Sequence, residues 1–158
     1  MKSRRFFLLS SLFGFLAAPR AALAQRAPGE EARRQAQADE AVRRITGGAP
    51  LRPGRVKLEL PPLIDNGNAV PLAVTVESPM SAADHVKAIH VIAQKNPQPY
   101  VLNAYIGPRA GRAQVRTRAR IADTQTVLAI AQMSDGSFWS DSVPVVVTLS
   151  ACLEDGLI

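Results

Sequence analysis

Beyond residue 55 the chain consists of short apolar or alternating runs separated by turn residues. The run 113–121 is the clearest, because Ala, Val, Thr and Ile alternate there with Gln and Arg. A period of two residues is typical of a β-strand with one buried and one solvated face. Comparable runs predict strands at 55–60, 70–77, 86–92, 100–106, 113–121, 126–133 and 143–149, and they allow a short one at 137–139.

Only one segment has helical character. Residues 30–45 are rich in Ala, Glu, Gln and Arg, and Gly47-Gly48 follows directly. This composition with a glycine stop predicts a short N-terminal helix. Since its apolar side is mostly alanine, the helix can bury little area, and we expect it on the surface of the domain.

The spacing of the strands indicates the fold class. About seven strands recur near every tenth residue without helices between them, which favours an all-β, immunoglobulin-like antiparallel β-sandwich. A small barrel is the alternative. The length of 158 residues suits one such domain.

Residues 1–24 differ from the rest of the chain. A basic start containing Arg4-Arg5 is followed by an apolar run over 6–18 and by the small-x-small end Ala22-Leu23-Ala24. This pattern predicts a secretory signal peptide, and paired arginines before apolar residues favour twin-arginine export over the ordinary Sec route. We therefore expect a periplasmic protein exported by the twin-arginine pathway.

The leader also accounts for the basic composition. It holds four of the 19 Lys and Arg and none of the 13 Asp and Glu, so its removal lowers the formal net charge from +6 to +2. Such a balanced chain has little driving force to bind nucleic acid, and we expect no such partner. The leader's apolar run of about 13 residues is shorter than the roughly 20 of a spanning helix, so we expect no membrane span.

The chain offers little chemistry apart from one thiol. With two histidines and one cysteine it shows no metal motif, and we expect no metal and no cofactor. We interpret His90 as a structural histidine on a strand face and His85 as part of a turn. Arg116, Arg118 and Arg120 form the charged side of one strand, which is typical of a solvated face, with an anion-binding stripe as the alternative. No catalytic constellation is present, so we expect that the protein is not an enzyme.

Cys152 has no second cysteine with which to form an internal disulfide. It could link two chains, carry or react with another group, or lie buried and inert. It stands three residues beyond Leu149, where the last predicted strand ends. Because chain ends are mobile unless they are held, the arm 150–158 could present the thiol to another protein.

Motifs spread over nearly the whole mature chain resemble those of the SoxY family, the sulfur-carrier subunits of periplasmic thiosulfate oxidation. Their order and spacing carry the resemblance. They are Ile64-Asp65-Asn66-Gly67-Asn68, Val70-Pro71-Leu72, Glu77-Ser78-Pro79-Met80, Val86-Lys87, Asn96-Pro97, Thr124-Gln125, Ala129-Ile130-Ala131, Ser134-Asp135-Gly136 and the strand that leads to Cys152.

The resemblance implies a domain organisation and a function. Residues 1–24 would be the twin-arginine signal peptide, 25–48 the helix, 49–149 the β-sandwich and 150–158 the C-terminal arm. Cys152 would bind a sulfur intermediate covalently, in a heterodimer with a SoxZ-like subunit that interacts with periplasmic sulfur-oxidising enzymes. An interaction subunit whose arm packs against a partner is the alternative, and a homodimer linked through Cys152 is a third reading.

The arm departs from the family pattern. A SoxY carrier ends in Gly-Gly-Cys-Gly-Gly, whereas Ser150, Ala151, Leu153 and Glu154 flank the cysteine here. The side chains make the arm thicker and stiffer than a glycine arm. The arm resembles that of a SoxY-related subgroup ending around Ala-Ala-Cys-Ile-Glu.

Overall fold

The computed structural model describes residues 28–149, which begin with helix α1 (Pro28–Thr46). Acidic residues stand in its first turn and Arg43 and Arg44 in its last, as the helix dipole favours. Gly47 ends the helix with φ of 62°, and its amide donates to the Arg43 carbonyl at 2.8 Å. The left-handed conformation suits glycine, which has no Cβ. The predicted N-terminal helix with a glycine stop is therefore confirmed.

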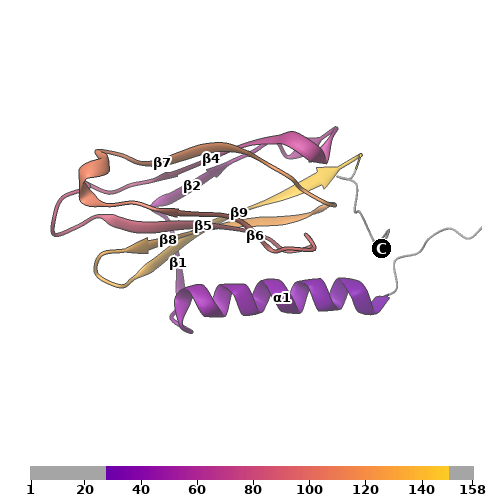
Figure 1. Ribbon diagram of the computed structural model, residues 1–158, viewed down its shortest axis with the longest axis horizontal. Helices are drawn as coiled ribbons and strands as arrows, with labels where there is room; N and C mark the ends of the chain where they lie inside the picture. The colour runs from indigo at the N-terminus through magenta and orange to yellow at the C-terminus, as the bar shows by residue number, and fades with distance from the viewer. Residues whose placement is uncertain (1–27, 150–158) are drawn as a thin grey trace, which may run out of the picture.

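The strands form two sheets (Figure 1). In the larger sheet, strands pair in the order β1 (Leu51–Pro53), β9 (Phe138–Val147), β8 (Gln125–Met133), β5 (Val86–Ala93) and β6 (Tyr100–Tyr105), and β3 (Leu63–Ile64) also pairs with β9. In the smaller sheet the order is β2 (Val56–Glu59), β4 (Val70–Val76) and β7 (Ala113–Ala119). Two single-turn 3-10 helices, η1 (Gly67–Ala69) and η2 (Pro108–Ala110), precede β4 and β7.

The two sheets pack face to face around one apolar core. Val74 of the smaller sheet and Ile89 and Val127 of the larger one are completely buried in it. Alternation along each strand supplies these inward residues, since successive side chains point to opposite faces. The predicted β-sandwich is confirmed, and the two separate sheets exclude the barrel.

The last strand differs from its prediction. Most of the runs 137–139 and 143–149 belongs to one continuous strand, β9, which covers 138–147. The residues between the two runs remain paired with β8, as in Ala129↔Asp141. Asp141 and Pro144 interrupt the apolar alternation, which hides this continuity in the sequence. The Asp141 carboxylate accepts a hydrogen bond from the Leu58 amide of β2 at 2.8 Å, so it joins the two sheets.

Two short strands, β1 and β3, run parallel to β9 in a sandwich that is otherwise antiparallel. They lie in the segment before β4, where the sequence predicted only the strand 55–60. With three and two residues they are too short to show a periodic pattern.

Helix α1 lies across the outer face of the larger sheet (Figure 1). Ala38 and Ala41 pack on the fully buried Ile92 of β5. The Arg34 guanidinium is buried at the same interface, where it donates to the Lys95 carbonyl at 3.2 Å and pairs with Glu30. The helix therefore covers the sheet with small residues, as its alanine-rich side predicted. Within residues 28–149, no helix is long and apolar enough to cross a membrane.

Candidate functional site

The site that the sequence singles out is the arm 150–158, which lies outside the described residues together with Cys152, Ser150, Ala151, Leu153 and Glu154. The structure describes the place where the arm leaves the domain. We call this place the arm root: residues Val146 to Leu149, which include the last two residues of β9 and the two that follow it, with the segments that bond to them.

Strand β9 is paired on both sides where it ends. On one side Gln125 of β8 lies opposite Val145. On the other, the parallel strand β3 places Leu63 opposite Val146. The strand is therefore held within a sheet up to the arm root rather than exposed at its edge.

Backbone hydrogen bonds continue past the strand to the last described residue. The Val146 amide donates to the Pro62 carbonyl at 2.8 Å and the Thr148 amide to the Ile64 carbonyl at 3.0 Å. The Leu149 carbonyl accepts a bond from the Gly67 amide at 3.0 Å. The chain is thus fixed through residue 149, and the arm starts immediately after it.

The motif Ile64-Asp65-Asn66-Gly67-Asn68 folds around the arm root. The Asn66 side chain caps η1 by accepting a bond from the Asn68 amide at 2.9 Å. Gly67 donates to Leu149 and its carbonyl accepts from the Ile121 amide at 2.8 Å, so it joins the arm root to the end of β7. These residues therefore position the base of the arm.

A second cluster supports the arm root from the other side. The Thr124 hydroxyl accepts a bond from the Val147 amide at 3.0 Å. Asn96 accepts from the Ala122 amide and from the Gln125 side chain, each at 2.9 Å, and donates to the Arg120 carbonyl at 2.9 Å. The motif residues Asn96, Thr124 and Gln125 therefore meet in space. Spacing along the chain could not show this, since the contacts depend on the folded loops.

Exposed apolar side chains surround the arm root. Leu63, Val146 and Leu149 are 58%, 51% and 61% exposed, although each is large and apolar. Leu63 and Val146 are paired neighbours, and Leu149 follows three residues later. Adjacent exposed apolar residues are typical of a surface that contacts another protein.

The two histidines occupy different surroundings. His85 Nδ1 lies 3.1 Å from the Ser81 carbonyl in the turn before β5, in agreement with its interpretation as a turn residue. His90 lies under α1 on the outer face of the larger sheet, 7% exposed, with Nδ1 2.7 Å from Asn103 Oδ1. No group of three or more potential metal ligands occurs among residues 28–149.

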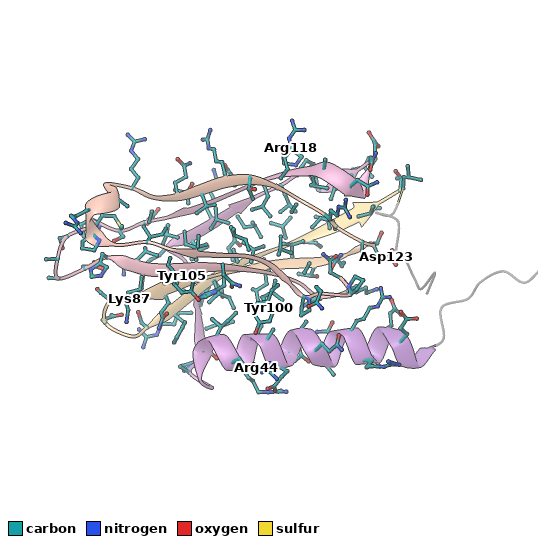
Figure 2. All side chains as sticks on the ribbon, in the orientation of Figure 1. Arg44, Lys87, Tyr100, Tyr105, Arg118 and Asp123 are labelled. Atoms are coloured by element: carbon teal, nitrogen blue, oxygen red, sulfur yellow. The ribbon has the colours of Figure 1, made fainter. Side chains whose placement is uncertain are left out.

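The arginines of β7 are solvated. Arg116 and Arg118 lie on the outer face of the smaller sheet, and Arg118 points away from the sandwich in Figure 2. On the same face Lys57 pairs with Glu59 at 2.6 Å. The hydrogen bond from Lys57 lowers the pKa of the Glu59 carboxyl, and the charge of Arg116 adds a smaller effect in the same direction. Arg120 lies beyond the end of β7 and is also exposed.

Fold and arm root together define a two-sheet sandwich whose last strand is fixed on both sides and continues into a C-terminal extension. The family model described as sulfur oxidation protein SoxY matches residues 42–152. The chain therefore belongs to the SoxY family of sulfur oxidation proteins. No curated protein matches the chain.

Solved structures show the same fold. The sulfur carrier protein SoxY from Chlorobium limicola f thiosulfatophilum is 23% identical with a TM-score of 0.61, over 72% of this chain and 98% of that one. A superoxide reductase (neelaredoxin) variant from Ignicoccus hospitalis is 16% identical with a TM-score of 0.53, over 65% of this chain and 85% of that one. These similarities concern the fold alone.

Proposed function

We propose that the protein is a periplasmic carrier subunit of sulfur oxidation that binds a sulfur intermediate covalently on Cys152. In this proposal it works as a heterodimer with a SoxZ-like subunit and is exported by the twin-arginine pathway. It is a substrate of periplasmic sulfur-oxidising enzymes and not itself an enzyme.

The extent of the family match carries this proposal. The match over residues 42–152 runs through the whole sandwich and ends at the single cysteine. The geometry of the arm root agrees with it, because backbone bonds fix the chain through Leu149 and leave Cys152 three residues further on. A rigid domain can then serve recognition while the thiol remains outside it.

The loading chemistry needs a second protein. With thiosulfate as the donor, a bond forms between the Cys152 sulfur and the outer sulfur of thiosulfate. The thiol releases one proton and two electrons leave, which gives a cysteine S-thiosulfonate. The electrons pass to an electron acceptor that the loading enzyme has to supply. Thiolate is the reactive form of the cysteine, so loading also requires its deprotonation.

Intact-mass measurement tests the proposal. The protein is purified without reductant from the periplasm of cells that oxidise thiosulfate, and its mass is compared before and after dithiothreitol. We expect a reductant-labile increase in mass that maps to Cys152, since a sulfur–sulfur bond is reducible.

Two variants serve as controls. Cys152→Ser should lose the increase, while Ser150→Ala, which changes the arm but keeps the thiol, should retain it. A bare thiol in protein from actively oxidising cells would contradict the carrier function.

The exposed side chains of Leu63, Val146 and Leu149 favour a second candidate, a docking subunit whose arm packs against a partner. The two functions differ in the accessibility of the thiol. Alkylation of Cys152 in the native protein should be fast for a carrier, and it should be slow until denaturant is added for a packed anchor.

A further inference from the structure

A cavity of about 310 Å³ lies between the C-terminal end of α1 and the edge strand β6, away from the arm root. Three strands and the helix contribute its polar lining, which consists of Arg44, His90, Tyr100, Asn103, Tyr105 and Gln132. Figure 2 shows Tyr100 between the sheet and the helix that carries Arg44. The sulfur chemistry proposed above does not use these residues.

His90 forms the floor of this cavity, which we call the His90 pocket. The Asn103 Oδ1 atom, 2.7 Å from His90 Nδ1, can only accept a hydrogen bond, so Nδ1 carries the proton. Within residues 28–149, the other ring nitrogen of His90, Nε2, has no hydrogen-bond partner. Every fully buried side-chain nitrogen or oxygen among these residues does have a partner, so Nε2 is not fully buried. Nε2 therefore reaches solvent through the pocket, although the residue is more than nine-tenths buried.

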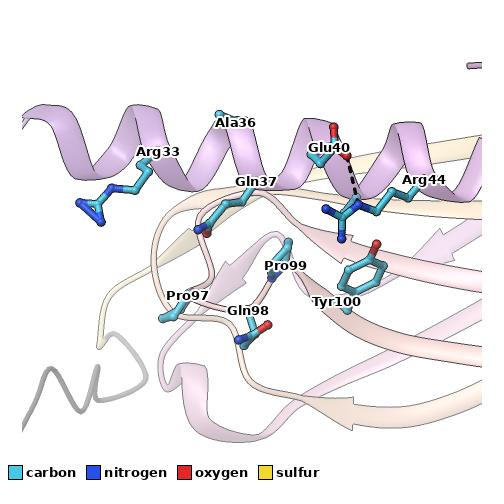
Figure 3. A pocket seen from close by; sticks show the side chains of 10 residues that line it. Arg33, Ala36, Gln37, Glu40, Arg44, Pro97, Gln98, Pro99 and Tyr100 are labelled. Carbon is cyan, nitrogen blue, oxygen red and sulfur yellow. Dashed lines mark hydrogen bonds and ion pairs between the residues drawn. The ribbon is translucent and has the colours of Figure 1, made fainter.

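The charge at the pocket is positive. Arg44 donates through Nε to Glu40 at 3.1 Å, and Arg43 donates to the other oxygen of the same carboxylate at 2.9 Å. One carboxylate between two guanidinium groups leaves a net positive charge. Among the described residues, Arg44 is the only one with a formal charge that lines the pocket, and Figure 3 shows its guanidinium between the helix and the Tyr100 ring.

Hydrogen-bond donors complete the lining. The Asn103 amide nitrogen, the Gln132 amide and the two tyrosine hydroxyls can all donate. No carboxylate from residues 28–149 lines the pocket. Donors around a cation are complementary to an anion with two oxygens, because charge-assisted hydrogen bonds are the stronger ones.

We propose that the His90 pocket binds a carboxylate group, with Arg44 and Asn103 donating to its oxygens and His90 donating through Nε2 when protonated. A second cavity of about 390 Å³ shares Arg44 and Tyr100 with the pocket and continues along α1 (Figure 3). It has room for the remainder of the ligand. The carboxylate belongs either to a free organic acid or to an acidic residue of a partner protein.

Binding of the carboxylate is linked to protonation of His90. The groups that face the imidazole are Arg44 of α1, balanced in part by Glu40, and Tyr100 and Tyr105 of β6, while β8 contributes the uncharged Gln132. Lys87 is the nearest charged residue along β5. An anion stabilises the imidazolium, so affinity for the carboxylate should be higher at lower pH.

Nuclear magnetic resonance of the histidine rings in the mature protein tests the proposal, with sodium succinate as the probe. Succinate should shift the imidazole signals of His90 and leave those of His85 unchanged. His85 is an internal control, because it lies in a turn outside the pocket. No effect on His90, or equal effects on both rings, would overturn the proposal.

Two exposed arginines provide matched variants. Arg44→Gln should weaken succinate binding on the order of tenfold, since it removes a charged donor. Arg43→Gln should have little effect, because Arg43 pairs with the same Glu40 but does not line the pocket. Equal effects of the two variants would show that only the general charge of the helix matters and would contradict the site.

A blocked tripeptide with a central glutamate separates the two sources of the carboxylate. Tighter binding of the peptide than of succinate assigns the pocket to a partner protein's acidic residue. Tighter binding of succinate assigns it to a free organic acid. If neither probe shifts the imidazole signals of His90, the pocket does not recognise carboxylates.

Discussion

Asn96 illustrates how one side chain sets the geometry of the arm root. Its side-chain oxygen accepts hydrogen bonds from the Ala122 amide and the Gln125 side chain, and its side-chain nitrogen donates to the Arg120 carbonyl. Gln125 extends the cluster by accepting a hydrogen bond from the Lys95 amide at 2.7 Å. The adjacent Thr124 binds the Val147 amide, so a change at Asn96 should be transmitted to the base of the arm.

We expect Asn96→Ala to lower the free energy of unfolding by about 2 kcal/mol, because partly buried groups lose their partners. Urea denaturation of the mature protein measures the change. Asn68→Ala is the control, since the Asn68 side chain makes one exposed bond to Asn66, and it should cost less than about 0.5 kcal/mol. Similar losses for both variants would contradict the structural role of Asn96.

At the level of elements, α1 stands apart from the main core. Its contact residues form a small cluster with Ile92 and Leu128, whereas the sandwich core contains no residue of the helix. The helix should therefore be able to detach while the two sheets remain folded. Its detachment would also open the His90 pocket, because Arg44 and Ile45 form one wall of that pocket.

Ala38→Glu tests this independence, because it places a carboxylate in the helix–sheet interface, where Ala38 is almost fully buried. In hydrogen exchange, we expect the amides of α1 to lose protection while those of β4, β5 and β8 keep theirs. Ala36→Glu is the matched control, since Ala36 is exposed on the same helix. Loss of protection throughout the sheets would show that helix and sandwich unfold as one unit.

The elements also show how far the sequence could predict the structure. Strands such as β7 and β8 were predictable because alternation is strong there. The strands β1 and β3 were not, because they are too short for periodicity, and the continuity of β9 was hidden by Asp141 and Pro144. The role of Cys152 stays a prediction from the sequence, because the residue lies outside the described ones. The His90 pocket could not be predicted, since its lining comes from four elements that meet only in the fold.

On the scale of the whole molecule, several exposed carboxyls favour their ionised form in the native state. Hydrogen bonds from Arg43 and Arg44 lower the pKa of Glu40, and that from Lys57 lowers the pKa of Glu59. Hydrogen bonds from the Ser137 hydroxyl and amide lower the pKa of Asp135 in the turn before β9. A carboxyl with a lowered native pKa stabilises the fold above its unfolded pKa and loses this effect as pH falls.

We therefore expect stability to decline as pH falls from about 5 to about 3, the range in which carboxyls titrate. Urea denaturation at a series of pH values measures it. Salt should weaken the contributions of Glu40 and Glu59, which depend on ion pairs, more than that of Asp135, whose partner is neutral. Asp135→Asn should flatten the decline, and an unchanged slope in this variant would contradict its part in the effect.

The two-sided pairing of β9 also has a mechanical consequence. Hydrogen bonds in an antiparallel ladder lie perpendicular to the strands, and those to β8 extend along most of β9. A force that pulls on residue 149 along the strand would load these bonds together in shear instead of opening them one after another. In the proposed carrier, the arm is thus attached to a strand whose many hydrogen bonds would resist tension together.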